Sequence, residues 1–444
     1  MPLLLLTLLA CTWQGASSRL GLVLPEDALP VDSAAVQDSG PAEDSAPPPP
    51  PDAPLEDIGA PPEAHVEEEA VPETGDLSGR IFNDDEVHTI DIYLDGPDYN
   101  ALLTDPYTYV AADFTFDGMR MEDVGLRLKG KIGSFRTLRQ KAAFKVDLNA
   151  FVPGRDLYGV NKFNLNNMAV DCSHMKEHLG YHTLASLGLP SLRTGWAWVR
   201  VNGEDYGLYN LLEHPDEDFL AQNYEDPTGN LYDGKYIWYG GWSYTLLDFY
   251  SSVHDLYPLE EGTDVGHADV HGVSAAIAVY GGTANYYSKM GGVVEWEQVL
   301  RYLAWEQWVG HNDGYALNTN NNFLYFKADD GKMNFLPWDL DYSFLEDYQW
   351  GMNWASPRGL LAWYCMTDTT TCREAWKAQA QVLLDTVDTA DQLAYLDQIQ
   401  TLTSDYIDRD PRRECRITDV ESGRAAIRAW VSNRPTYLRS FWGL

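Results

Sequence analysis

The sequence predicts an α+β fold in which a small, strand-rich lobe is followed by a larger helical lobe. Residues 89–95 (TIDIYLD) alternate apolar and polar side chains with a period of two, as half-buried strands do. Residues 294–310, and several segments within residues 373–442, instead repeat apolar side chains at helical spacing. Because the strand patterns come first, strands and helices are expected to segregate in the fold.

Further strands are predicted in the first half at ADFTFDG, VGLRLKG and AAFKVDL, which also alternate. A helix is expected over residues 173–187, with Asp171 or Ser173 as its N-cap. The segment AWVRVNGEDYGLYNLLE contains Asn202-Gly203, a strong signal for a two-residue hairpin turn. We therefore expect two more antiparallel strands after the helix.

The N-terminal residues predict an export signal. The opening run MPLLLLTLLAC is apolar up to Cys11 and is shorter than the ~20 residues that span a bilayer. Its length fits the apolar part of a signal peptide over residues 1–18. The Leu-Leu-Ala-Cys ending resembles a bacterial lipobox, in which the cysteine is lipidated. An ordinary cleaved signal peptide, and so a secreted protein, is the alternative; both place the chain outside the cytoplasm.

Residues 19–79 predict a disordered tether. From Leu20 to Gly79 there is no Lys or Arg, but there are fifteen Asp and Glu residues and a run of five prolines. Such a segment cannot bury enough apolar surface to offset the entropy of ordering. Residues 80–444 are then the folded domain, within which residues 233–292 are rich in Gly and Tyr and predict an irregular insertion.

The charge of the chain excludes one class of partner. The formal net charge is −36, and residues 80–444 retain 52 acidic and 30 basic residues, a net charge of −22. Nucleic-acid binding draws much of its affinity from neutralising phosphates, so nucleic acid is not an expected partner. No later segment is apolar and long enough to cross a membrane, which leaves the lipid anchor as the expected membrane contact.

The cysteines fit an oxidising compartment. Without Cys11, four remain, which allow three disulfide pairings. The short spacing between Cys365 and Cys372 favours that pair, which leaves Cys172 to pair with Cys415. Four free thiols are the alternative. No Cys and His spacing resembles a zinc site.

A glycine-containing turn with nearby cations is the first candidate site. The segment VGLRLKGKIGSFRTLRQKAAFKVDL places Arg127 and Lys129 before the turn and Lys141 and Lys145 after it. Glycine lets backbone N–H groups approach phosphates closely, and lysine adds a positive charge. We interpret the four cations as phosphate-binding residues; a hairpin with surface lysines is the alternative.

Two glutamates are candidates to support these lysines. Glu177 lies in the first turns of the predicted helix, where it would pair with Lys145 or interact favourably with the helix dipole. Glu213 lies at the end of the strand GLYNLLE, where the chain would pass from the first lobe to the second.

The segment VGHNDGYALNTNNNFLYFKADDGKMNFLPWDLDYSF carries the strongest signal. Asp313 follows a predicted helix, and Asp339 and Asp341 follow the second strand of a predicted hairpin. A hairpin brings the loop before its first strand and the loop after its second strand to one end, so these carboxylates are expected to cluster. Mg2+ prefers such oxygen ligands, and a remaining carboxylate can accept a hydroxyl proton. An acidic turn with capping Asp residues is the alternative.

Together these segments resemble the CotH kinase family, named for spore coat protein H. The chain contains RLKGKIGS, KAAFKVDL, NLNNMAVDCSHMKEHLGY, GEDYGLYNLLEHPDEDFL, NDGYALNTNNNFLY and FLPWDLDYSF in the family order, over about residues 85–345. The resemblance implies a diverged protein-kinase-like fold with two lobes. It also implies transfer of the γ-phosphate of ATP to protein hydroxyl groups, with ATP and Mg2+ as cofactors and a protein substrate outside the cytoplasm.

Carried over by position, Asp313 resembles the family's catalytic base and Asp339 its metal-binding aspartate. Lys145 resembles the phosphate-binding lysine, with Glu177 as its partner. Asn321 fits the spacing of the family's Asn-x-x-Leu-Tyr pattern and is preferred as the metal-binding asparagine.

Three more residues have expected roles. Asn318 is the alternative metal ligand, because it lies five residues after the aspartate, as in the ordinary kinase catalytic loop. Asp341 would support the metal site, and Glu213 resembles a linker residue near the adenine. A non-catalytic, surface-anchored binding protein on the same scaffold is the main alternative function, and a Ca2+-dependent surface module is a third.

Overall fold

The computed structural model describes residues 76–444 except 240–242, 346–352 and 369. Cys11, the predicted signal peptide and the tether as far as residue 75 lie outside the described residues. Ser78, at the end of the predicted tether, is buried, and Arg193 donates a hydrogen bond to its hydroxyl. The folded part therefore includes residue 78, two positions before the predicted boundary.

The protein mixes strands and helices. The strands are β1 (Val87–Tyr93), β2 (Val110–Phe116), β3 (Met119–Lys129), β4 (Ala143–Asp147), β5 (Lys162–Asn166), β6 (Thr194–Val201), β7 (Glu204–Glu213), β8 (Asn230–Asp233), β9 (Ile237–Tyr239), β10 (Ser243–Thr245), β11 (Leu259–Glu261), β12 (Asn322–Phe326) and β13 (Met333–Pro337). The helices are α1 (Gly96–Thr104), α2 (Lys176–Ser186), α3 (Glu217–Asn223), α4 (Ala268–Tyr280), α5 (Tyr286–Met290), α6 (Trp296–Val309), α7 (Tyr315–Asn318), α8 (Leu360–Thr367), α9 (Cys372–Thr386), α10 (Thr389–Arg409) and α11 (Ile417–Trp442).

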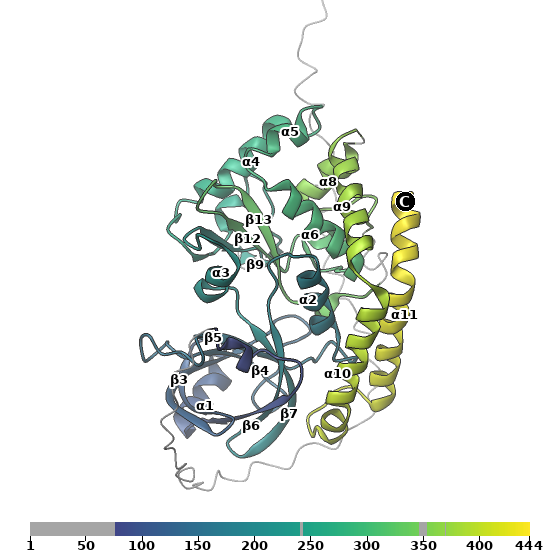
Figure 1. Ribbon diagram of the computed structural model, residues 1–444. Helices are drawn as coiled ribbons and strands as arrows, with labels where there is room; N and C mark the ends of the chain where they lie inside the picture. Colours follow the sequence, from purple (N-terminus) through teal and green to yellow (C-terminus); the bar gives the residue numbers. More distant parts are fainter. Residues whose placement is uncertain (1–75, 240–242, 346–352, 369) are drawn as a thin grey trace, which may run out of the picture. The chain divides into compact units, whose positions relative to one another are not determined.

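The first seven strands form a closed barrel in the order β1-β2-β3-β4-β5-β7-β6 (Figure 1). β1 closes it by pairing in parallel with β6, whereas the other neighbours are antiparallel. Alternation along β4 turns Phe144 and Val146 into the apolar interior, as predicted, and Lys145 to the outside. The barrel thus presents a row of polar side chains on its outer face.

The predicted hairpin turn is confirmed. Asn202 and Gly203 join β6 and β7, and their φ angles are 50° and 81°. Positive φ at both central residues is the property for which Asn-Gly is selected in such turns. The register set at the turn shifts at a bulge between Val199 and Arg200, beyond which Asn210 pairs with Trp196.

Helix α2 begins later than the sequence pattern suggests. His174 has a φ of 55°, a left-handed conformation that no helix continues through. The Asp171 carboxylate instead accepts hydrogen bonds from the N–H groups of Ser173, Met175 and Lys176, at 2.9 Å each. The predicted N-cap is wrong, because Met175 is the N-cap residue, but the Asp171 carboxylate holds the non-helical turn before it and so helps to place Glu177 in the first turn of the helix.

A second sheet, with strand order β11-β8-β12-β13, lies among the helices. β11 belongs to the segment that was predicted to be an irregular insertion, as do α4 and α5, so this prediction was wrong. Val270, Val273 and Ile277 of α4 join the apolar core of the helical part. Burial of these side chains explains why the Gly- and Tyr-rich segment nevertheless holds a regular helix.

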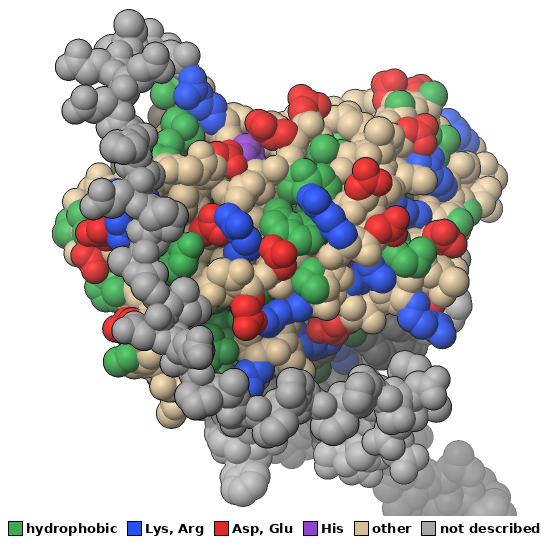
Figure 2. Space-filling model, turned by 90° about the horizontal axis from the view of Figure 1, so that it is seen from below, with side chains coloured by type: hydrophobic (Ala, Val, Ile, Leu, Met, Phe, Trp, Pro, Cys, Tyr) green, Lys and Arg blue, Asp and Glu red, His purple; other side chains and the backbone are tan. Residues whose placement is uncertain are grey.

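The C-terminal part is helical, and α10 runs beside α11 (Figure 1). Within the described residues, no helix combines the length and apolar character needed to cross a membrane. On the face shown in Figure 2, acidic and basic side chains are interspersed among apolar ones. Ion pairs such as Arg200–Asp91 (2.5 Å) and Arg412–Glu204 (2.8 Å) match opposite charges locally, despite the acidic net charge.

Candidate functional site

A cavity of about 500 Å³ lies between the outer face of the barrel and the β12–β13 hairpin. Eight of the predicted site residues line it: Arg127, Lys129, Lys145, Glu177, Asp313, Asn321, Asp339 and Asp341. Such a concave site with convergent polar groups is the usual form of a small-molecule site. The cluster that the sequence predicted from separate segments is thus brought together.

The barrel supplies the basic wall of the cavity. Arg127 of β3 is the antiparallel partner of Lys145 on β4, which in turn pairs with Asn164 on β5. Directly paired residues project to the same face of a sheet, and Lys129 shares that face because it lies two residues after Arg127. The outer face therefore carries three cations side by side, with apolar neighbours turned into the barrel.

The loop after α6 supplies Asp313. α6 ends at Gly310, whose left-handed conformation (φ 60°) stops the helix. The buried carboxylate of Glu306 in α6 then accepts hydrogen bonds from the N–H groups of Tyr315 (2.7 Å) and Ala316 (3.0 Å) at the start of α7. A Cβ atom at Gly314 would lie 2.2 Å from Glu306 Oε1, so any larger residue there would displace the Glu306 side chain. Glu306 thus fixes both ends of the Asp313 loop.

Three asparagines hold the Asp313 carboxylate. The side-chain amide of Asn318 donates to Oδ1, and those of Asn320 (3.1 Å) and Asn321 (2.9 Å) donate to Oδ2. Burial raises the pKa of Asp313 to about 6, and these hydrogen bonds oppose the rise. Asp313 is consequently a stronger base than an exposed aspartate and is still ionised at neutral pH.

The hairpin brings Asn321 and Asp339 to the same edge, as predicted. Asn322 is the partner of Pro337, and the Trp338 N–H donates to the Asn321 carbonyl at 2.9 Å. Asp339 has a φ of 48°, an uncommon conformation for a residue other than glycine. His311 Nε2 lies 3.1 Å from the Asp339 carbonyl oxygen, a contact that links the hairpin to the Asp313 loop.

Carboxylates exceed cations at this edge. Burial and the charge of Asp339 raise the pKa of Asp341 well above its ordinary value, and the same two causes raise the pKa of Glu177. Lys129 is the cation that offsets Glu177 and Asp339, while Lys176 offsets Asp341. Among the described residues, Glu177 Oε1 is buried without a hydrogen-bond partner. An unbalanced group of carboxylates of this kind, with Glu177 buried and Asp339 and Asp341 half-buried, fits a divalent cation held by Asp339, Asp341 and Asn321.

The predicted pairing of Lys145 with Glu177 is wrong. Lys145 Nζ lies 2.7 Å from His214 Nε2, and burial lowers the lysine pKa to about 8. Glu177 Oε2 accepts instead from the amides of Asn166 (2.7 Å) and Asn210 (2.6 Å), and Lys129 Nζ donates to Asn166. Lys129 therefore has the position beside Glu177 that the sequence assigned to Lys145.

Lys141 and Glu213 do not line the cavity, which corrects two further predictions. Lys141 precedes β4 and forms a buried ion pair with Asp410 (2.5 Å). Glu213 lies an odd number of residues after Asn210, so strand alternation turns it away from the cavity face, and it pairs with Arg193 at 2.5 Å.

The structure favours Asn321 over Asn318 as the metal-binding asparagine. Asn321 lines the cavity. Both polar groups of the Asn318 side chain are occupied, since its amide donates to Asp313 and its oxygen accepts from Arg358 Nη1 at 3.0 Å.

Several residues of the site were missed in the sequence. Asn166 and Asn210 hold Glu177, as described above. The Tyr236 N–H donates to Asn320 Oδ1 at 2.8 Å, and Asn320 in turn donates to Asp313. Asn166 ends β5 within the quoted segment NLNNMAVDCSHMKEHLGY, but no pattern in the sequence indicated that Tyr236 would reach the Asp313 loop.

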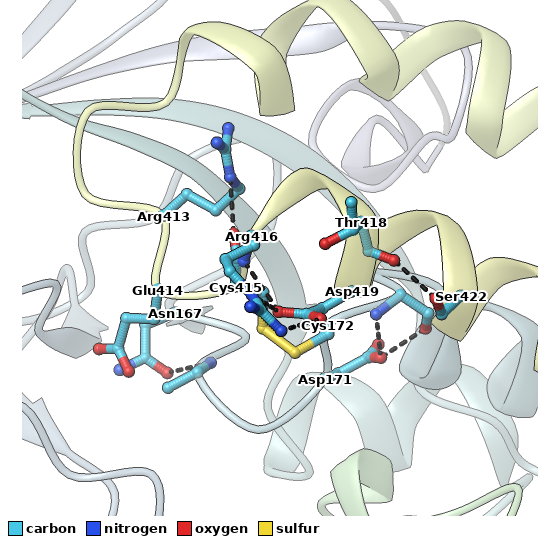
Figure 3. Close-up of a disulfide and its surroundings, with 12 residues drawn as sticks. Asn167, Asp171, Cys172, Arg413, Glu414, Cys415, Arg416, Thr418, Asp419 and Ser422 are labelled. Carbon is cyan, nitrogen blue, oxygen red and sulfur yellow. Dashed lines mark hydrogen bonds and ion pairs between the residues drawn. A yellow bond between two sulfur atoms is a disulfide. The ribbon is translucent and has the colours of Figure 1, made fainter. Parts of the chain in front are cut away.

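The predicted disulfides are both present. Cys365 pairs with Cys372, and Cys172 pairs with Cys415 across 243 residues of sequence. Figure 3 shows the second bond beside Asp171, the residue that caps the turn before α2. The loop that positions Glu177 is therefore covalently joined to the segment before α11.

Comparison with known proteins agrees with these motifs. The family model for CotH kinase protein matches residues 126–438, so the match continues beyond the motifs recognised in the sequence and into α11. Inner spore coat protein H of Bacillus subtilis (strain 168) is 22% identical over 307 residues, which cover 65% of this chain and 81% of that protein. Because the family model covers well over half of the chain and includes every residue placed in the cavity above, this protein belongs to the CotH kinase protein family.

Proposed function

We propose that this protein is an ATP-dependent protein kinase that acts outside the cytoplasm and transfers the γ-phosphate to protein hydroxyl groups. The observation that carries the proposal is the pairing of a basic barrel wall with an acidic loop edge across one cavity. In this proposal the barrel and the helical part are the two lobes of a diverged kinase fold, and the cavity is the cleft between them.

The cations of the barrel wall would bind the phosphates. Lys129 and Arg127 lie on the face that meets the hairpin, and Lys129 Nζ is 5.0 Å from the centre of the Trp338 ring. Held beside Glu177, Lys129 is the residue best placed to contact a phosphate close to the metal edge. Lys145, farther along the strand pair, would contact a second phosphate.

The acidic edge would carry out the transfer. Asp339, Asp341 and Asn321 would hold Mg2+, which neutralises charge on the phosphates as they react. The substrate hydroxyl oxygen forms a bond to the γ-phosphorus while the bond from that phosphorus to the β-phosphate oxygen breaks and ADP leaves. Asp313 takes the hydroxyl proton on a carboxylate oxygen.

Two findings support the proposed location. Two disulfides form in the described residues, as expected of a protein in an oxidising compartment. The relative from Bacillus subtilis bears the name of a spore coat protein. In the proposal, lipidated Cys11 anchors the protein to the membrane, and the acidic tether separates it from the kinase domain.

The test combines a binding measurement with a transfer measurement. Mg·ATP should raise the melting temperature of the wild-type chain, because a ligand that binds only the folded state stabilises it. Asp313→Asn should keep this stabilisation and lose about 10²–10⁴-fold in phosphate transfer from labelled ATP. Asp339→Asn should lose both.

Asp330→Asn is the matched control, since Asp330 lies at the opposite end of the same hairpin, where it pairs with Lys332. It should behave as wild type in both measurements. Absence of any nucleotide effect on the wild-type chain would refute the kinase proposal and favour a non-catalytic binding protein.

A further inference from the structure

A second group of metal-type ligands lies away from the cavity, in the segment between β10 and α6. His254 and Asp255 belong to a short 3-10 helix, His254–Leu256, that contacts α4, and His271 lies in the second turn of α4. One ligand atom from each of the three residues lies within 4.8 Å of the others. The two imidazole rings are 4.1 Å apart between centroids.

Both rings face the same carboxylate oxygen. His271 Nε2 contacts Asp255 Oδ1, and His254 Nε2 lies 3.7 Å from that atom. An ordinary surface ion pair between His271 and Asp255 would account for the first contact. It does not account for the second imidazole, whose Nε2 is too far away for a hydrogen bond. Among the described residues, His254 Nδ1 has no partner, which leaves Nε2 as the nitrogen that faces other polar atoms.

We propose that His254, Asp255 and His271 bind one zinc-type transition-metal ion, with the remaining coordination position open to water. In a tetrahedral site with bonds of about 2.0–2.1 Å, ligand atoms are roughly 3.3 Å apart, so the observed separations need only small side-chain movements. Two imidazole nitrogens and one carboxylate oxygen suit Zn2+, whereas Mg2+ and Ca2+ prefer oxygen alone.

The elements that carry the ligands are already fixed by packing. Val270 and Val273, on either side of His271, are buried in the core of the helical part, and Tyr257, two residues after Asp255, is also buried. His267 is not a ligand, because its Nε2 contacts the Tyr257 carbonyl oxygen at 2.7 Å. A metal ion would therefore join two pre-positioned elements rather than order a loose segment.

Binding of the ion would restrain one wall of the cavity. The segment between Asp255 and His271 contains β11, and Glu260 of β11 lines the cavity. The site is separate from the site of the proposed kinase activity, since none of its three residues lines the cavity.

The test uses Zn2+ as the probe on the full chain after treatment with a chelator. Wild-type protein should bind one Zn2+ at this group by calorimetry and elemental analysis, in addition to any held at the cavity edge, with a rise in melting temperature. His271→Gln and His254→Gln should each weaken binding at least about tenfold, because even outer partners of a metal site are worth ~10–100-fold in affinity. Co2+ in place of Zn2+ should give visible absorption bands without a thiolate band, since the four described cysteines are paired.

His182→Gln is the matched control: His182 is a half-buried imidazole that stacks on Tyr395 and lies outside the group. It should bind Zn2+ as the wild type does. The proposal is overturned if the wild-type chain binds no Zn2+, if the His254 and His271 variants keep its affinity, or if His182→Gln loses it equally. Stabilisation by Mg·ATP is measured in a separate experiment. A chain that is not stabilised by Mg·ATP can therefore be distinguished from a chain that does not bind zinc.

Discussion

Two groups of charges in this protein differ in whether their charges balance. Lys141 and Asp410 form a 1:1 pair whose side chains are 3% and 2% exposed, and Asp410 also accepts hydrogen bonds from the N–H groups of Leu208 (3.1 Å) and Arg412 (2.8 Å). At the cavity edge, by contrast, Glu177, Asp339 and Asp341 exceed the cations described beside them, and Glu177 Oε1 has no partner among the described residues.

This difference in charge balance distinguishes a group that stabilises the fold from a group that is suited to bind a ligand. The balanced pair has no excess charge that a ligand would neutralise, and its role is to hold the barrel against the end of α10. An unbalanced group stores repulsion that an added cation or a bound proton relieves, so the protein carries it at a cost in stability. The sequence assigned Lys141 to phosphate binding because it could not show which lysine already had a partner.

The largest expected effect comes from breaking the balanced pair. Lys141→Met should lower the free energy of unfolding by about 3–5 kcal/mol, because it leaves the Asp410 carboxylate buried without its cation. Chemical denaturation with the disulfides intact measures the change. Lys141→Met combined with Asp410→Asn should recover part of the loss; a single variant that loses less than about 1 kcal/mol would show that the pair is not structural.

Glu306 is a third kind of charged group, a buried carboxylate that accepts hydrogen bonds from N–H and O–H donors and has no cation beside it among the described residues. Burial raises its pKa to about 7. The folded state therefore binds the proton more tightly than the unfolded state, whose pKa is near 4.5. Its contribution to stability is full below pH 4.5 and is lost as the pH rises to about 7, on the order of 3 kcal/mol.

Glu306→Gln should remove that part of the pH dependence. Unfolding curves collected at several pH values between 4.5 and 7.5 measure it, with Glu297→Gln, on the exposed face of the same helix, as the control. Equal slopes for wild type and Glu306→Gln would contradict the assignment.

At the unbalanced group in the cavity, we expect a mutation to change the free energy of unfolding in the opposite direction. Asp341→Asn should raise the free energy of unfolding of the metal-free protein by about 1–2 kcal/mol, because it removes like-charge repulsion. The same variant should weaken stabilisation by Mg·ATP. Melting temperatures with and without Mg·ATP test both halves, and a destabilised metal-free variant would show that the carboxylates do not repel one another in the folded protein.

The smallest expected effect concerns Lys145. Its pKa of about 8 means that its positive charge is present at pH 7 and mostly lost by pH 9. ATP binding should therefore weaken a few-fold over this range, on the order of 1 kcal/mol or less. Lys145→Arg, which keeps its charge, should abolish this pH dependence in a calorimetric titration. An unchanged pH dependence in Lys145→Arg would assign the effect to another group.

Sequence patterns predicted those features of the site that involve residues close together in the chain. The Asn202-Gly203 turn, the alternation that turns Lys145 to the outer face of the barrel, and the hairpin that joins Asn321 to Asp339 each depend on neighbouring residues. Long-range pairing decided the rest. Lys145 and Lys129 share one face of the barrel, and the amides of Asn166 and Asn210 on β5 and β7 determine which of the two lies beside Glu177.

Other features lie beyond any local pattern. The Lys141 partner is 269 residues away, and barrel closure depends on the parallel pairing of β1 with β6. His254 and His271 are separated by a strand and a turn of helix, so their spacing resembles no zinc motif. Such contacts follow from the whole fold rather than from a segment.

The Cys172–Cys415 bond has a consequence for the durability of the protein. A protease that cuts the backbone once at any point between these two cysteines would leave two fragments that remain linked. The fragments would hold the loop before Glu177 against α11 until a reductant released them. A nicked molecule would therefore migrate as one species without reductant and as two with it, and it would keep the residues of the cavity together after damage that divides an uncrosslinked chain.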